Sequence, residues 1–324
     1  MTAVARTRSA PDYVLLNGVD EPPPPVARTF RVGPLSVVLD GVDLRYVRLG
    51  DVEVVRRLYA AVRDRDWNTI FGTPSEIEFD DRGDSFDVRF SVRHVSHDID
   101  FTWKGTIAGD TDGRISYAFA GTGQRGLFYN RIGFCVLHPF RETVGQPYRA
   151  RTPNGVVSGT FPLLVAPQRF ENGVYIPLFP SFDQLEISLA NGGSVRFDLE
   201  GDLWETEDQR NWTDASFKSY RTPLQLGFPH ELKEGDRIDQ RVSFAVIDLP
   251  ATAPTAARRR PATTLTVVRC GDRTLPRLGL AVPYDGASCT LRELELLRAL
   301  HLDHPSRRRE TPGRRLRGIA RVRA

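Results

Sequence analysis

The fold is decided by residues 35–58, which read LSVVLDGVDLRYVRLGDVEVVRRL. Apolar and polar side chains alternate within each segment, the pattern of a strand that is buried on one face only. The dipeptides Asp40-Gly41 and Gly50-Asp51 separate the segments, and such pairs form the tight turns of β-hairpins. This stretch therefore predicts antiparallel strands that pair in sequence order.

The same pattern continues to about residue 249, without a long helical segment in between. Further alternating segments lie at residues 76–79, 85–92, 99–103, 114–119, 133–137, 155–161, 184–189, 194–199 and 239–247. So many short strands predict a mainly β fold, a large antiparallel two-sheet sandwich. Its size and strand order resemble the supersandwich of galactose-mutarotase-like domains, a likeness of fold only.

Composition indicates a soluble globular chain. Hydrophobic residues make up 40% of the 324 residues, enough for a substantial core. The net charge is +3, but the basic excess lies in the last twenty residues, so the body of the chain offers no basic stripe for nucleic acid. No stretch approaches the roughly 18 apolar residues of a spanning helix, so no membrane partner is expected.

Cysteine usage favours the cytoplasm. Cys135, Cys270 and Cys289 are widely spaced and form no Cys-x-x-Cys pair, which argues against a disulfide framework and a structural zinc site. The residues also hold no phosphate loop, dinucleotide fingerprint or Gly-x-Ser-x-Gly elbow, so no cofactor is predicted.

Changes of composition divide the chain into five parts. The N-terminal part ends in Pro22 to Pro25, a stiff segment that cannot join a sheet ladder. The predicted parts are a disordered Pro-rich tail (1–28), the β-sandwich (29–249), a linker (250–263), the start of a β/α barrel (264–304) and an Arg-rich tail (305–324).

The part beyond the linker predicts one strand and one helix. Leu278 to Val282 is typical of a short buried strand, and Thr290 to Leu300 has the pattern of an amphipathic helix. Thr290 is the expected N-cap, and Glu293 completes a capping box. A strand followed by a helix is typical of the opening of a β/α barrel, here incomplete.

Beyond His304 the chain loses hydrophobic periodicity and becomes rich in arginine. Such composition is what a GC-rich gene gives when it is translated out of frame, so the sequence predicts a truncated or frameshifted protein. A basic tail for nucleic acid or an anionic membrane is the alternative.

The densest group of polar side chains lies in residues 204–220, which read WETEDQRNWTDASFKSY. In an extended segment Glu205 and Glu207 share a face, and their repulsion is expected to raise one pKa toward neutrality. The alternative is that Arg210 or Lys218 neutralises the two carboxylates. We predict a structural or binding role for Glu205 and catalytic roles for Glu207 and Asp208. The expected substrate-binding residues of this stretch are Arg210, Asn211, Trp212, Asp214 and Lys218.

Two other segments contribute candidate site residues. His138 should lie where an apolar strand leaves the sheet, and its imidazole is a candidate general base that activates water. Arg131 is a candidate for gripping a carboxylate or polarising a carbonyl, and Trp67 for stacking on a sugar ring. His94 and His97 should lie on opposite faces of a strand, so no metal site is predicted.

Four blocks of the sequence resemble the D-apionate lactonase family of bacterial sugar-acid catabolism. They are EDQRNWTDASFK at residues 207–218, YAAVRDRDWNTI at 59–70, DIDFTWKGTI at 98–107 and NRIGFCVLHP at 130–139. The resemblance covers roughly residues 30–300. It implies hydrolysis of the lactone ring of D-apionolactone to the open acid, with a small sugar lactone as ligand. It does not identify the catalytic residues, and the oligomeric state stays open.

Two alternatives to a lactonase remain at this point. A non-catalytic carbohydrate-binding sandwich would use Trp67, Trp103 and Trp212 as stacking platforms. A mutarotase-like sugar isomerase would use His138 and Glu207 as its acid and base.

Overall fold

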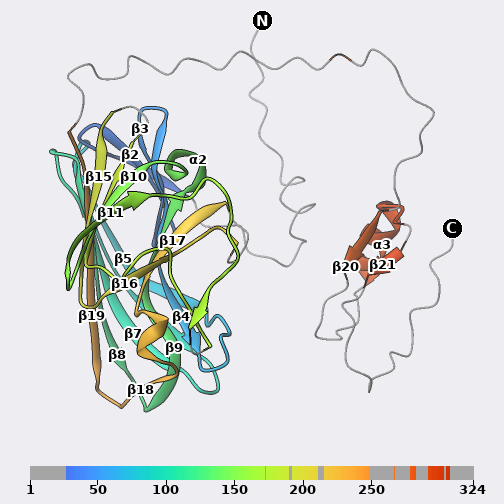
Figure 1. Ribbon diagram of the computed structural model, residues 1–324. Helices are drawn as coiled ribbons and strands as arrows, with labels where there is room; N and C mark the ends of the chain where they lie inside the picture. The colour runs from blue at the N-terminus through green and yellow to red at the C-terminus, as the bar shows by residue number, and fades with distance from the viewer. Residues whose placement is uncertain are drawn as a thin grey trace, which may run out of the picture. The chain divides into compact units, whose positions relative to one another are not determined.

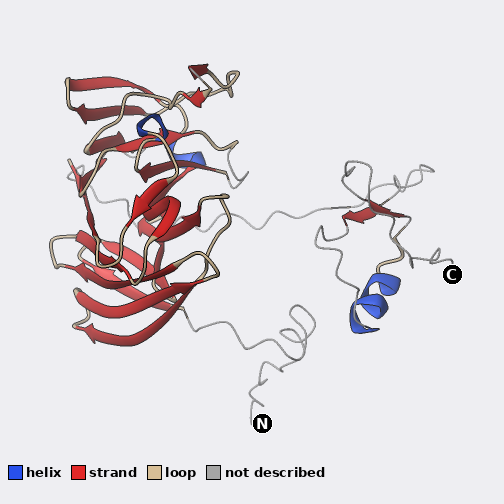
Figure 2. Cartoon of the chain, turned by 90° about the horizontal axis from the view of Figure 1, so that it is seen from below, coloured by secondary structure: helices blue, strands red, loops and turns tan. Residues whose placement is uncertain are grey.

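The computed structural model describes residues 27–171, 173–189, 192–210, 215–248, 266, 278–281, 291–302 and 304–306. Contacts divide the chain into two compact units, Met1–Arg258 and Arg259–Ala324. The predicted linker 250–263 lies outside the described residues, as do residues 1–26 and 307–324 of the predicted tails. In the first unit the described elements are almost all strands, as Figures 1 and 2 show.

Eight described strands form the first sheet. They run in the order β1-β2-β3-β4-β9-β17-β16, with β18 paired to β9. Strand β9 therefore has β4 on one edge and both β17 and β18 on the other. The bounds are β1 Arg28–Val32, β2 Leu35–Asp40, β3 Asp43–Leu49, β4 Val52–Asp64, β9 Leu127–Pro139, β16 Trp204–Glu207, β17 Ser216–Arg221 and β18 His230–Leu232.

Nine described strands form the second sheet, in the order β11-β10-β14-β15-β19-β8-β7-β6-β5. All of its pairs are antiparallel. The bounds are β5 Gly72–Asp81, β6 Phe86–Val95, β7 Asp100–Gly109, β8 Arg114–Gly123, β10 Pro147–Thr152, β11 Gly155–Thr160, β14 Gln184–Ser188, β15 Ser194–Glu200 and β19 Arg237–Ile247.

The core lies between the two sheets. In β6 every second residue from Phe86 to Val92 is buried, because a strand turns alternate side chains to opposite faces. Phe134 of the first sheet meets Tyr117 and Phe119 of the second, with ring centroids 4.5 and 5.7 Å apart. Side chains from both sheets thus fill one core, which confirms the predicted antiparallel two-sheet sandwich.

One polar side chain joins the two sheets through this core. Gln240 of β19 accepts a hydrogen bond from the Phe134 backbone N–H (2.9 Å) and donates one to the Ile132 carbonyl oxygen (3.2 Å). Between these residues Gly133 has φ +142°, and a Cβ there would collide with the Gln240 side chain. Glycine is therefore required at this position of β9.

Short elements complete the first unit. They are helix α2 (Phe140–Thr143), the 3₁₀ turn η1 (Leu224–Leu226) and the hairpin of β12 (Phe170–Glu171) and β13 (Val174–Tyr175). No described helix of the protein has the length and apolar character needed to cross a bilayer.

The described residues of the second unit form a β-α-β arrangement. Strands β20 (Gly279–Ala281) and β21 (His304–Ser306) are parallel, and helix α3 (Leu291–Ala299) lies between them in sequence. Strand β21 begins at His304, where the sequence loses its hydrophobic periodicity. A strand of three residues needs no alternation, so the pattern did not reveal it. The predicted cap Thr290 lies outside the described residues, and this arrangement alone does not establish a barrel.

Candidate functional site

The outer face of the first sheet, turned away from the second sheet, carries the candidate site. In β16 the side chains of Trp204 and Thr206 are buried on the core side, so Glu205 and Glu207 point to the outer face together. Strand pairing then sets Lys218 of β17 directly opposite Glu207. The next row across this face contains Tyr59, Cys135, Tyr220 and Glu205, from β4, β9, β17 and β16.

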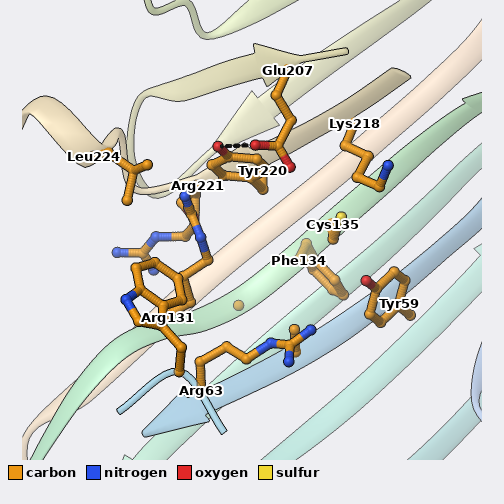
Figure 3. Close-up of a pocket in the computed structure, with 13 residues that line it drawn as sticks. Tyr59, Arg63, Arg131, Phe134, Cys135, Glu207, Lys218, Tyr220, Arg221 and Leu224 are labelled. Carbon is orange, nitrogen blue, oxygen red and sulfur yellow. Dashed lines mark hydrogen bonds between the residues drawn. The ribbon is translucent and has the colours of Figure 1, made fainter. Parts of the chain in front are cut away.

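A cavity of about 270 Å³ lies over these rows (Figure 3). This is the small end of the range for ligand pockets and suits a single sugar ring. Four predicted site residues line it: Trp67, Arg131, Glu207 and Lys218. The other lining residues are Tyr59, Ala61, Arg63, Gly133, Phe134, Cys135, Tyr220, Arg221 and Leu224.

Glu207 and Lys218 supply opposite charges at one end of the cavity (Figure 3). Both are nearly buried, with 4% and 3% of each residue exposed. Glu207 Oε2 accepts a 2.8 Å hydrogen bond from the Tyr220 hydroxyl. Burial raises the pKa of Tyr220, so this hydroxyl keeps its proton and remains a donor. A held carboxylate beside an ammonium group is suited to proton transfer at a carbonyl.

Arg131 lies flat against Tyr220. Its guanidinium carbon is 3.4 Å from the centroid of the Tyr220 ring and 5.7 Å from that of Trp67. Its hydrogen bonds go to the carbonyl oxygens of Arg221 (2.9 Å) and Thr222 (3.1 Å) and to Glu205 Oε1 (3.3 Å). Three of its N–H contacts are thus made to the protein itself.

Glu205 is fully buried behind this arginine. Its Oε1 also accepts the Leu224 backbone N–H at 3.0 Å. Burial raises the pKa of Glu205, and the charge of Arg131 and the Leu224 N–H lower it by less. The main cause of the raised pKa of Glu205 is therefore burial, and not the repulsion from Glu207 that was expected from the sequence.

Asp64 anchors the loop that brings Trp67 to the cavity. Its side chain accepts hydrogen bonds from the backbone N–H groups of Asp66 and Asn68 and from Asn68 Nδ2, at 2.9, 2.8 and 2.9 Å. Trp67 has φ +66° and packs edge-on against Phe228, with centroids 5.3 Å apart. This arrangement holds the indole at the wall of the cavity.

Cys135 and Tyr59 form part of the cavity floor. Burial raises the pKa of the Cys135 thiol to about 11, although a hydrogen bond with Tyr59 lowers it in part. The thiol is therefore protonated near neutral pH, so it is a poor nucleophile there.

His138 lies on the inner face of the sheet. Its ring packs edge-on against Phe197 of the second sheet, with centroids 5.1 Å apart, and its Nε2 lies 2.8 Å from Ser219 Oγ. Burial lowers the pKa of His138 to about 3, so the ring is neutral.

The sheet therefore separates His138 from Glu207, contrary to the expectation that both act at one site. His138 pairs with Phe217, whose side chain is in the core, whereas Glu207 pairs with Lys218 on the outer face. Neighbouring residues of β17 point to opposite faces, which puts the backbone of the sheet between the two side chains.

Asp208 and Arg210 pair with each other. Arg210 Nε lies 3.0 and 3.1 Å from the two Asp208 oxygens, and Arg210 Nη2 lies 2.6 Å from Oδ2. Burial opposes ionisation of Asp208, but the hydrogen bonds and charge of Arg210 lower its pKa overall. Neither Asp208 nor Arg210 lines the cavity. Tyr175 of β13 lies near Asp208 and Glu207. Burial and the charges of these two carboxylates raise the pKa of Tyr175 to about 12.

The remaining predicted residues fall elsewhere. Asn211, Trp212 and Asp214 lie outside the described residues. Trp103 is buried in the core and stacks on Phe119 at 4.6 Å, so it is not a stacking platform on the surface. His94 is buried and accepts a hydrogen bond from Trp103 Nε1, while the His97 side chain is exposed.

Tyr59, Arg63 and Arg221 also line the cavity, although they were not among the predicted site residues. The alternation of side chains along β4 could have revealed this face of the strand, because Tyr59, Ala61 and Arg63 lie on it together and are polar or small. No three described histidine, cysteine, aspartate or glutamate side chains gather into a possible metal site.

A protein-family model described as the N-terminal domain of D-apionate lactonase matches residues 14–248. The chain belongs to this family. A D-apionate lactonase from Brucella anthropi is 28% identical over 273 residues, which are 84% of this chain and 43% of that protein. The predicted resemblance is confirmed, and the chain spans less than half the length of this curated relative.

Solved structures with some similarity include two galactose mutarotase relatives. A galactose mutarotase related enzyme from Lactobacillus acidophilus is 9% identical, with TM-score 0.42, over 71% of this chain and 100% of that one. A galactose mutarotase-like protein from Lactobacillus casei is 12% identical, with TM-score 0.42, over 68% of this chain and 99% of that one.

Proposed function

We propose that the cavity over the first sheet binds a sugar-acid lactone and that Glu207 and Lys218 promote its hydrolysis. The substrate proposed from the family is D-apionolactone, and the product is D-apionate. The observation that carries the proposal is the pairing of two nearly buried residues of opposite charge, Glu207 and Lys218, at the wall of a cavity of sugar-ring size.

In this proposal Glu207 is the general base. It takes a proton from water as the water oxygen bonds to the lactone carbonyl carbon, and the carbonyl π electrons move to the oxygen. The Lys218 ammonium stabilises that oxyanion. When the tetrahedral intermediate collapses, the ring C–O bond breaks and the leaving alkoxide takes the proton back from Glu207.

Binding of the ring would involve the opposite side of the cavity. Trp67 offers a flat face for the C–H groups of a sugar ring, and the Arg63 guanidinium offers donors for its hydroxyl oxygens. The bound ring would also displace water from Glu207 and Lys218, which strengthens their interactions with the developing charge.

The test is hydrolysis of D-apionolactone by the 324-residue chain, followed as acid release. Glu207→Gln should lower kcat by about 10²- to 10⁴-fold, because the amide cannot accept the proton. Glu234→Gln is the matched control, since Glu234 is exposed in a turn, and it should behave as the unchanged protein. Equal rates for the two variants would overturn the assignment of Glu207.

A non-catalytic carbohydrate-binding domain is the second candidate, favoured by the loop that holds Trp67 at the cavity. Calorimetry separates the two. Binding of D-apionolactone or D-apionate that is weakened by Trp67→Ala, with no acid release above background, would favour this candidate. The isomerase alternative is not proposed, because His138 and Glu207 lie on opposite faces of the sheet.

A further inference from the structure

The buried Glu205 carboxylate carries out no step in the proposed reaction. Its Oε1 takes two donors, Arg131 Nη2 at 3.3 Å and the Leu224 backbone N–H at 3.0 Å. Burial of a charge is costly, and removing one member of a buried ion pair leaves the other uncompensated. The Glu205–Arg131 pair therefore has to stay together in the folded protein.

The first consequence is a fixed guanidinium group. Arg131 is held by Glu205 on one side and by the carbonyl oxygens of Arg221 and Thr222 on another. Hydrogen bonds in several directions leave a planar guanidinium little freedom to turn. Since these N–H groups are occupied, Arg131 is poorly placed to grip a substrate carboxylate, the role expected from its sequence position.

The second consequence is a fixed phenol ring. The guanidinium carbon of Arg131 lies 3.4 Å from the centroid of the Tyr220 ring, which is close cation–π contact. The same ring carries the hydroxyl that donates to Glu207 Oε2 at 2.8 Å (Figure 3). The orientation of the ring thus sets the position of the donor.

We propose that Glu205, Arg131 and Tyr220 form a positioning relay that holds the Glu207 carboxylate in its orientation toward the cavity. None of the three is a catalytic residue in this proposal, which rests on the proposed function of Glu207 as general base. A general base must be held within hydrogen-bond reach of the proton that it removes, and a rigid supporting shell provides this.

The relay is first tested without any activity assay, by NMR of the arginine Nε–H signals. A proton held over an aromatic ring is shifted upfield, so the Arg131 signal should lie upfield in the unchanged protein. Tyr220→Leu removes the ring and gives the unshifted position as a reference. Glu205→Gln keeps an acceptor for Leu224 but loses the charge, and it should move the Arg131 signal most of the way toward that reference.

The second test is kinetic and uses Tyr220→Phe, which keeps the ring and removes the hydroxyl. We expect kcat to fall about 10- to 100-fold, less than for loss of the base itself, with KM within about threefold. The acid limb of the pH–rate profile should move to higher pH, because a hydrogen bond that favours the charged carboxylate is lost. Tyr46→Phe, at an exposed tyrosine, is the matched control.

The two tests keep the relay separate from the proposed function. If the unchanged protein hydrolyses no lactone, the proposed function fails, and the NMR comparison still decides whether Glu205 orients Arg131 against Tyr220. An Arg131 signal that is unchanged in Glu205→Gln would overturn the relay. So would a Tyr220→Phe variant with normal kcat and an unmoved acid limb in an active protein.

Discussion

His138 Nε2 lies 2.8 Å from Ser219 Oγ, on the inner face of the sheet whose outer face carries Glu207. A serine beside a histidine suggests a nucleophile and its base, but each residue is only 1% exposed. Ser219 also lies 2.7 Å from Thr206 Oγ1, so the histidine belongs to a polar group within the core. Buried hydrogen-bonded groups of this kind help to fix strand register.

His138 should make the protein sensitive to mild acid. Burial lowers its pKa from 6.5 to about 3, so below pH 6.5 the unfolded chain binds a proton that the folded one does not. Stability therefore falls as the pH drops from about 6.5 toward 3, by roughly 3 kcal/mol from this group at pH 4. Urea unfolding at pH 7, 5.5 and 4 should show that the free energy of unfolding falls less with pH in His138→Gln than in the unchanged protein.

His97→Gln is the control for this measurement, because the His97 side chain is 97% exposed. His94, whose pKa burial also lowers, contributes in the same direction and is unchanged in both variants. If both variants lost stability in parallel with the unchanged protein, His138 would not be the buried neutral group that the structure describes.

Gly133→Ala should destabilise the sandwich. The φ of +142° disfavours an L side chain, and the new Cβ would collide with Gln240. We expect a loss of roughly 2 to 4 kcal/mol in the free energy of unfolding, measured by urea denaturation. Gly126→Ala is the control, since a Cβ there meets nothing within 4 Å. Equal effects at both positions would refute the requirement for glycine in β9.

Asp64→Ala should loosen the loop that carries Trp67. The variant loses three hydrogen bonds to one carboxylate, which we expect to cost roughly 1 to 2 kcal/mol. Hydrogen exchange should speed up at the Asn68 amide, whose acceptor is Asp64 Oδ1. Asp66→Ala changes an exposed carboxylate of the same loop and should leave the exchange rate as it is. An unchanged Asn68 rate in Asp64→Ala would contradict this account.

Cys135 should resist alkylation in the folded protein. A pKa near 11 instead of 9.0 lowers the thiolate fraction at pH 8 about 100-fold, and burial limits access further. The measurement is iodoacetamide labelling of a Cys270→Ser, Cys289→Ser variant, with and without urea. Labelling at similar rates in both conditions would show that the thiol is not enclosed at the cavity floor.

The sequence by itself determined the class of fold. Residues 35–58 contain both the alternation that buries one face of a strand and the turns that reverse the chain, and both are local properties. The same alternation correctly put Glu205 and Glu207 on one face of β16. The twelve residues 207–218 were enough to indicate the family.

Only the tertiary structure decided which strands lie next to each other, and so which of their side chains form the site. Arg131 reaches the carbonyl oxygen of Arg221, ninety residues away, because β9 and β17 are neighbours in the sheet. The same pairing put His138 in the core and Glu207 at the cavity, a separation that neither segment reveals alone. Alternation is a property of one strand, whereas a site on a sheet depends on the register between strands that are distant in sequence.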